Sequence, residues 1–166
     1  VDILVDGSLD LDDSLLELMD WVVASVHSHF TRDNTGRIVA ACQSPFVNAI
    51  GHPSGRLLGK RKAYPLEMEK LIIKAAETGT ALEINAQPQR IDIDGVWAKK
   101  AMDSGVMLVI GTDAHHISNF KYMEQGVTTA RRGWCGEKNI LNTRKWADIE
   151  KFVSAKREKY GVKSSV

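Results

Sequence analysis

Hydrophobic residues along the chain form short β-branched runs that alternate with stretches of helical spacing. The runs predict five strands, at Val1–Val5, Trp21–Val26, Val47–Ile50, Ala81–Ile84 and Met107–Ile110. Consecutive apolar positions within each run are typical of strands that are buried on both faces of a parallel sheet.

The stretches between these runs predict helices at Leu11–Asp20, Pro65–Glu77, Ile93–Ser104, Asn119–Arg131 and Arg144–Lys159, with frayed residues at Val162–Val166. Strand–helix alternation implies right-handed crossovers and a parallel sheet in an α/β domain. Periodicity alone does not distinguish an open doubly wound sheet from part of a closed barrel.

Composition adds limits on the class of protein. The chain has 166 residues, one domain in size, and a net charge of +1, so any contact with nucleic acid must come from a local basic patch. Cys42 and Cys135 have no CxxC spacing, which favours reduced thiols in a cytoplasmic protein. No apolar run reaches the roughly 18 residues that a membrane span needs.

The histidines follow the predicted strands. The five are His27, His29, His52, His115 and His116. Three strands lead directly into His27, His52 and the Asp113-x-His115 pair, and a fourth carries Glu83 and ends at Asn85. The carboxyl ends of parallel strands meet on one face, and imidazoles with a carboxylate are ligands of Zn²⁺, Mn²⁺ or Fe²⁺. A lone strand-end histidine is usually a turn residue, so this metal-site hypothesis depends on three coincidences together.

A glycine-rich basic loop follows His52. Arg56, Lys60 and Arg61 in this loop are candidates for binding substrate phosphate, and Arg131 and Arg132 are weaker candidates. The alternative is a basic loop that is merely solvated.

Several of these motifs stand in the order seen in PHP (polymerase and histidinol phosphatase) domains. They are Ala24–Ser28, Gly51–Arg56, Leu82–Asn85 and Thr112–His115; Gly126–Trp134 and Ile140–Thr143 resemble the end of this domain in bacterial family X DNA polymerases. The resemblance implies a distorted seven-stranded (β/α) barrel with up to three divalent ions, Mn²⁺, Zn²⁺ or Fe²⁺.

The resemblance also suggests roles for single residues. His27, His52, Asp113 and His115 match metal ligands, with His115 alternatively a proton shuttle, and Glu83 with Asn85 would support the site. In bacterial family X polymerases the domain is associated with Mn²⁺-dependent 3′–5′ exonuclease and related phosphoesterase activity, which implies DNA or another phosphoester as the substrate of the parent protein.

Three features of the family pattern are missing: the His-x-His motif, the Asp-His pair and the glutamate of its first three strands. We therefore expect residues 1–166 to be the C-terminal portion of a single PHP domain, with about five of its strands and little or no activity alone. The alternatives are a stand-alone phosphatase of the histidinol-phosphatase type and a non-catalytic module that packs on DNA or on a polymerase body.

The two sides of such an incomplete barrel would be Val1–Val5 and Met107–Ile110. We expect unpaired backbone groups at both, and hence dimerisation, aggregation or pairing with a separate N-terminal half.

Overall fold

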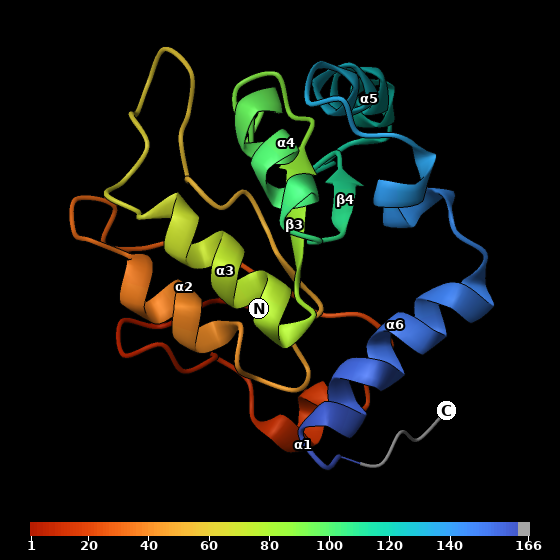
Figure 1. Ribbon diagram of the computed structural model, residues 1–166. Helices are drawn as coiled ribbons and strands as arrows, with labels where there is room; N and C mark the ends of the chain where they lie inside the picture. Colours follow the sequence, from red (N-terminus) through yellow and green to blue (C-terminus); the bar gives the residue numbers. More distant parts are fainter. Residues whose placement is uncertain (163–166) are drawn as a thin grey trace.

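The computed structural model describes residues 1–162; the last four residues of the predicted frayed segment lie outside this range. Its sheet has four parallel strands in chain order: β1 (Val23–Ala24), β2 (Ala49–Ile50), β3 (Ala81–Asn85) and β4 (Leu108–Gly111). In Figure 1 the arrows of β3 and β4 point toward the loop that follows β2, while α1 and α6 lie near the opposite end of the sheet. The α/β class and the open parallel sheet agree with an incomplete (β/α) barrel.

The first predicted strand, Val1–Val5, is shorter than expected. It forms only isolated bridges, Asp2 with Ser25 in parallel and Ile3 with Leu9 in antiparallel. The amide of Ile3 donates to the Ser25 carbonyl at 2.8 Å, so this segment still lies beside β1 at the edge of the sheet.

Helices flank the strands. They are α1 (Asp13–Leu16), α2 (Thr35–Ala41), α3 (Met68–Thr78), α4 (Gly95–Asp103), α5 (Met123–Arg132) and α6 (Trp146–Lys159), with 3₁₀ turns η1 (Ile117–Tyr122), η2 (Glu137–Asn139) and η3 (Leu141–Thr143). The prediction missed α2. It extended α1 too far, because Leu15 and Leu18 are exposed rather than packed. It also merged η1 with α5.

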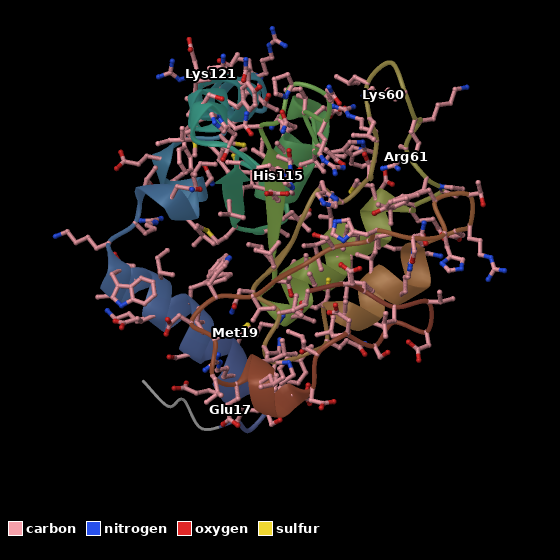
Figure 2. The ribbon with its side chains drawn as sticks, turned by 180° about the vertical axis from the view of Figure 1, so that it is seen from behind. Glu17, Met19, Lys60, Arg61, His115 and Lys121 are labelled. Carbon is pink, nitrogen blue, oxygen red and sulfur yellow. The ribbon has the colours of Figure 1, made fainter. Side chains whose placement is uncertain are left out.

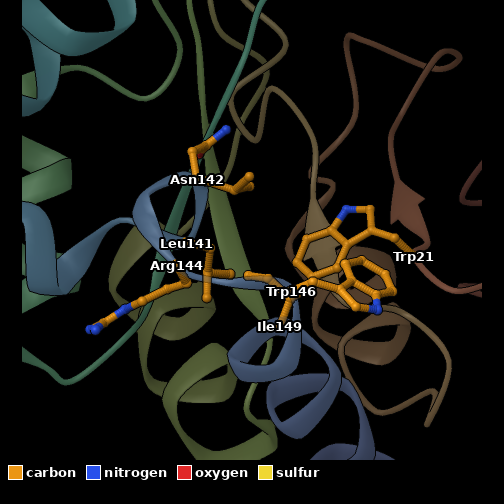
Figure 3. Close-up of a pocket in the computed structure, with 7 residues that line it drawn as sticks. Trp21, Leu141, Asn142, Arg144, Trp146 and Ile149 are labelled. Carbon is orange, nitrogen blue, oxygen red and sulfur yellow. The ribbon is translucent and has the colours of Figure 1, made fainter. Parts of the chain in front are cut away.

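The two faces of the sheet have different cores. Side chains such as Leu82 and Leu108 join α2–α5 in the larger cluster, whereas Ala49, Ala81 and Val109 face Leu141 and α6. On this second face, Trp21, Val109, Leu141, Asn142, Arg144, Trp146 and Ile149 line a cavity of about 300 Å³. Figure 3 shows Trp21 beside Trp146 at this cavity. None of these lining residues is a candidate metal ligand.

Both edges of the sheet are hydrogen-bonded, and the expectation of unpaired backbone groups there was wrong. Asp10 donates its amide to the Asp2 carbonyl at 3.1 Å and accepts the Asp2 amide on its carboxylate at 2.7 Å. At β4, the Asn142 side chain binds the amide and the carbonyl of Ile110, at 2.7 and 3.0 Å. The edges are thus capped from within the chain.

Within residues 1–162, no helix is long and apolar enough to cross a membrane.

Candidate metal centre

Two histidines from adjacent strand ends point their rings at one another. The Nε2 atoms of His27 and His52 lie 3.2 Å apart, and the ring planes are inclined at 60°. His52 is buried, and burial, followed by the charges of Arg90 and His27, lowers the pKa of its imidazole to about 4. A neutral imidazole keeps a lone pair for a metal ion.

Asp2 orients the first of these rings. Its Oδ1 lies 2.6 Å from His27 Nδ1, so the opposite nitrogen of the ring is directed toward His52. A carboxylate on the second nitrogen of a ligating histidine fixes its tautomer and raises its basicity. No local pattern in the sequence marks Asp2, because its partner lies 25 positions away along the chain.

Arg37 holds this corner together from α2. Its buried guanidinium donates to the carbonyl of Ile3 at 3.1 Å and to the carbonyl of Ser28 at 2.5 Å. These bonds tie the segment that carries Asp2 to the loop that carries His27, so Arg37 is a positioning residue for the pair.

Glu83 lies beneath the histidine pair. Its Oε2 accepts the backbone amide of His52 at 2.6 Å and the Asn85 side-chain amide at 3.2 Å. Burial raises the pKa of Glu83 to about 7. Both residues therefore support the His52 loop, and that support depends on the absence of a side chain at Gly111, where a Cβ would lie 1.9 Å from Glu83 Oε1.

Asp113 is within an ion pair. Its Oδ2 accepts from Arg90 Nε at 3.0 Å, and both side chains are mostly buried. Arg90 was not singled out in the sequence either; its only signal was its place shortly after the end of the Ala81–Asn85 strand. The backbone here is unusual, since His52, Ile91 and Asp113 all have positive φ, at 31°, 46° and 50°. Such conformations cluster at functional sites.

The remaining histidines lie at the surface. His115 is 83% exposed, and its Nδ1 contacts the carbonyl oxygen of Asp113 at 2.8 Å. His116 caps η1 by accepting the Ser118 backbone amide on its Nδ1 at 3.2 Å, and His29 is exposed. The ring of His115 thus lies outside the His27–His52 pair, and its role as a ligand or proton shuttle stays a prediction.

The predicted phosphate-binding residues have different surroundings. The guanidinium of Arg56 donates to the carbonyls of Arg90 and Ile91. Arg61 donates to the Gly55 carbonyl at 2.8 Å. Lys60 is exposed near the tip of the same loop, and Figure 2 shows it with Arg61 in the upper half of the molecule, where His115 also lies.

Arg131 and Arg132 are exposed in the last turn of α5. Within residues 1–162 neither side chain forms a hydrogen bond or ion pair with a candidate ligand. Their phosphate-binding role stays a prediction.

The donors fit a divalent ion in kind and, for two of them, in position. Two nitrogens bound at tetrahedral angles and at zinc–nitrogen distances would lie about 3.3 Å apart, close to the separation of the His27 and His52 Nε2 atoms. Across the described residues, however, no group of three or more His, Cys, Asp or Glu side chains is arranged to hold an ion. The arrangement thus offers two convergent imidazoles, while the carboxylate of Asp113 forms an ion pair with Arg90.

Comparison with known proteins gives the context. No protein-family model matches the chain. The chain is 46% identical over 156 residues to the C-terminal part of the DNA polymerase/3'-5' exonuclease PolX of Bacillus subtilis, covering 92% of this chain and 27% of that protein.

Shorter relatives carry a different name. The chain is 30% identical over 168 residues to a probable phosphatase of Thermoanaerobacter sp. strain X514, covering 94% of this chain and 66% of that protein. It is 27% identical over 168 residues to a probable phosphatase of Caldanaerobacter subterraneus, covering 94% of this chain and 63% of that protein. The chain thus spans less than two thirds of the length of each of these relatives.

Proposed function

The chain belongs to the PHP family, and from this membership we propose that it is part of a phosphoesterase that cleaves phosphate esters with divalent metal ions held at the carboxyl ends of its strands. The observation that carries the proposal is the convergence of the His27 and His52 Nε2 atoms at 3.2 Å, with Asp2 on the His27 ring and Glu83 on the backbone amide of His52.

His27 and His52 would hold one ion, and Asp113 and His115 would complete or extend the ligand set. When bound, a divalent ion supplies a Lewis acid that stabilises negative charge on a phosphoryl oxygen. Asp2 keeps the imidazole of His27 in its ligating tautomer. Mn²⁺, Zn²⁺ and Fe²⁺ all accept this mixture of imidazole and carboxylate donors.

For the substrate, we propose DNA cleaved from its 3′ end within a longer parent protein of the family X polymerase kind. The support is the similarity to PolX, which is closer in identity than the similarity to the probable phosphatases. The second candidate is a phosphatase for a small phosphomonoester, which the names of the shorter relatives favour.

For the 166-residue chain alone, we propose weak binding of one or two ions and little or no exonuclease activity. Only two imidazoles converge in the described residues, and loss of ligands weakens metal affinity and removes bridging geometry. A module that only packs on DNA or on a polymerase body is the non-catalytic alternative.

The test combines metal content with hydrolysis. Mass-verified chain would be titrated with Mn²⁺ and Zn²⁺ by calorimetry, and then assayed on 3′-labelled single-stranded DNA and on histidinol phosphate. We expect weak binding of either ion that His52→Asn weakens further, and any residual cleavage to favour DNA. Preference for histidinol phosphate would support the phosphatase, and failure to bind either ion would support the packing module. Robust exonuclease activity would contradict the proposed weakness of the isolated chain.

A further inference from the structure

Arg90 has donor groups that the protein does not use. It lies in the turn between β3 and α4, with a side chain that is 15% exposed. Its Nε donates to Asp113 at 3.0 Å, but its buried Nη1 has no hydrogen-bond partner within the described residues. A guanidinium carries five N–H donors, and a buried charged donor without an acceptor is costly. Nη2 also lacks a hydrogen-bond partner within the described residues but is not enclosed, so an acceptor from outside the chain can reach this edge of the guanidinium.

The turn that carries Arg90 is fixed from two sides. Arg56 Nε donates to the Arg90 carbonyl at 2.8 Å and its Nη2 donates to the Ile91 carbonyl. The amide of Leu58, in the basic loop, donates to the carbonyl of Gln89 at 2.6 Å. The loop after β2 and the turn after β3 are therefore hydrogen-bonded to one another, and these bonds fix the backbone that carries the guanidinium of Arg90.

A second guanidinium lies near the first. Arg61 stacks on the ring of Phe30, with 3.6 Å from its guanidinium carbon to the ring centroid, and donates from Nε and Nη2 to the Gly55 carbonyl. Burial and then the charge of Arg90 lower the pKa of Arg61, which is consistent with two like charges close to one another. Asp113 is the one carboxylate that forms an ion pair with this pair of arginines in the described residues.

The candidate metal ligands border the same space. The charge of Arg90 acts on the pKa of His52, and Arg90 is bonded directly to Asp113. Of these two partly buried cations only Arg90 has a carboxylate partner in the described residues, and an anion placed there would offset the charge of Arg61. Planar guanidinium groups favour phosphate oxygens as acceptors, because two N–H donors match two oxygens.

We propose that Arg90, together with Arg61, forms a subsite for the phosphoryl group of the substrate, with Arg90 Nη2 donating to a phosphoryl oxygen. This inference rests on the proposed function in so far as the substrate is a phosphate ester. It revises the assignment made from the sequence: Arg56, which is occupied by two backbone carbonyls, positions the turn, and Arg90 takes the contact with the substrate.

A purely structural role for Arg90 is the competing explanation. Its ion pair with Asp113 joins the turn after β3 to the loop after β4, and this alone would give the residue a place in the fold. The two explanations differ in what happens to anion binding: a structural tie changes thermal stability, whereas a subsite changes the dissociation constant of phosphate in protein that remains folded.

The experiment uses the whole chain with EDTA, so that any phosphate bound is bound by protein groups. Inorganic phosphate would be titrated by NMR into wild-type protein, Arg90→Met, Arg90→Lys and the control Arg32→Met, which removes an exposed arginine. We expect phosphate binding to weaken at least about tenfold in Arg90→Met, to be intermediate in Arg90→Lys and to be unchanged in the control. Binding by Arg90→Met equal to that of the wild type would overturn the subsite.

A second measurement needs no change at Arg90. In wild-type protein the assigned Arg90 Nε–H resonance should shift on phosphate addition, and it should not shift if the contact is absent. Two further probes separate the sources of the phosphoryl group: thymidine monophosphate offers a terminal phosphate and the dinucleotide TpT offers a diester. If phosphate binding depends on Arg90 but the chain binds neither Mn²⁺ nor Zn²⁺, the subsite stands and the proposed metal-dependent function is wrong. If the chain binds metal but phosphate binding does not depend on Arg90, the proposed function stands and the subsite is wrong.

Discussion

His27 and His52 lie at the ends of neighbouring parallel strands, and their Nε2 atoms are 3.2 Å apart. The pairing follows from the register of the sheet, because Ala24 lies opposite Ile50 and the chain then leads to each histidine within three residues. The strands bring the two histidines close together. Asp2, through its contact with the His27 ring, and Glu83, through its bond to the His52 backbone amide, then fix their orientation.

Removal of one imidazole tests whether this pair binds a metal ion. We expect His52→Asn to weaken the affinity for Mn²⁺ and Zn²⁺ at least about tenfold. Loss of a side chain that binds the ion should cost at least as much affinity as loss of a residue that only orients such a side chain. Asparagine tolerates the positive φ of 31° at this position, so the backbone is spared. His29→Asn is the matched control, since His29 also has positive φ but lies at the surface. Equal losses in both variants would contradict the assignment.

Asp2 should act on metal binding through His27. We expect Asp2→Asn to weaken metal affinity by about 10–100-fold, the usual cost of losing a carboxylate behind a ligating histidine. Calorimetry with Zn²⁺ would measure the loss, and Asp12→Asn, at an exposed carboxylate, is the control. An affinity in Asp2→Asn equal to that of the wild type would show that the bond to His27 Nδ1 does not direct the ring.

Part of this fold could be predicted from the sequence. The Ala81–Ile84 run and the apolar spacing after Pro65 located β3 and α3, because both elements bury consecutive or helically spaced apolar residues. By contrast α2 went unrecognised, since it is short, contains Gly36 and buries the charged Arg37, which hides its apolar face.

The candidate site was predictable only where a strand leads directly to a ligand. This rule brought out His27 and His52, which do converge. It could not bring out Arg90, whose importance depends on a buried Nη1 and on an ion pair across 23 residues. Nor could it show that Arg56 is occupied by backbone carbonyls, because a basic loop has the same sequence whether its cations face solvent or the chain itself.

Lys156 makes stability depend on pH. Its buried Nζ donates to the carbonyls of Cys42 and Val47 and to Thr80 Oγ1, and burial lowers its pKa from 10.5 to about 8. Between these two values the unfolded chain holds more protons than the folded chain, so this group makes the free energy of unfolding rise as pH increases from about 8 to 10.5. Below pH 8 the fold bears the cost of the buried charge.

We therefore expect Lys156→Met to lower the free energy of unfolding by about 1–3 kcal/mol at pH 7, because three acceptors lose their donor. The deficit should widen toward pH 10. Urea unfolding at pH 7 and pH 9.5 would measure both values, with the exposed Lys151→Met as the control. A deficit that stays constant or narrows with pH would contradict the lowered pKa of Lys156.

The carboxylate of Glu83 occupies the space that a side chain at position 111 would need, so we expect only glycine to fit there without cost. An alanine Cβ there would lie 1.9 Å from Glu83 Oε1, so we expect Gly111→Ala to lower the free energy of unfolding by about 1–3 kcal/mol, as overpacking does. Gly36→Ala is the control, since no atom lies within 4 Å of the position that its methyl group would take and alanine favours the helix by about 0.5–1 kcal/mol. A Glu83→Ala background should relieve the Gly111→Ala penalty, and equal penalties in both backgrounds would place the clash elsewhere.

Self-association should use the second face of the sheet rather than its edges. Asp10 and Asn142 already satisfy the edge groups of Asp2 and Ile110. Trp146, by contrast, is 56% exposed at the cavity that it shares with Trp21 and Val109, and burial of such apolar surface drives association.

We expect light scattering over a concentration series to show oligomers, and Trp146→Glu to shift the protein toward monomer. Trp134→Glu, which changes a tryptophan that is 79% exposed after α5, should leave the oligomeric state unchanged. Equal dissociation in both variants would indicate general hydrophobic association, and a wild-type monomer at all concentrations would show that the capped edges and α6 already protect the sheet.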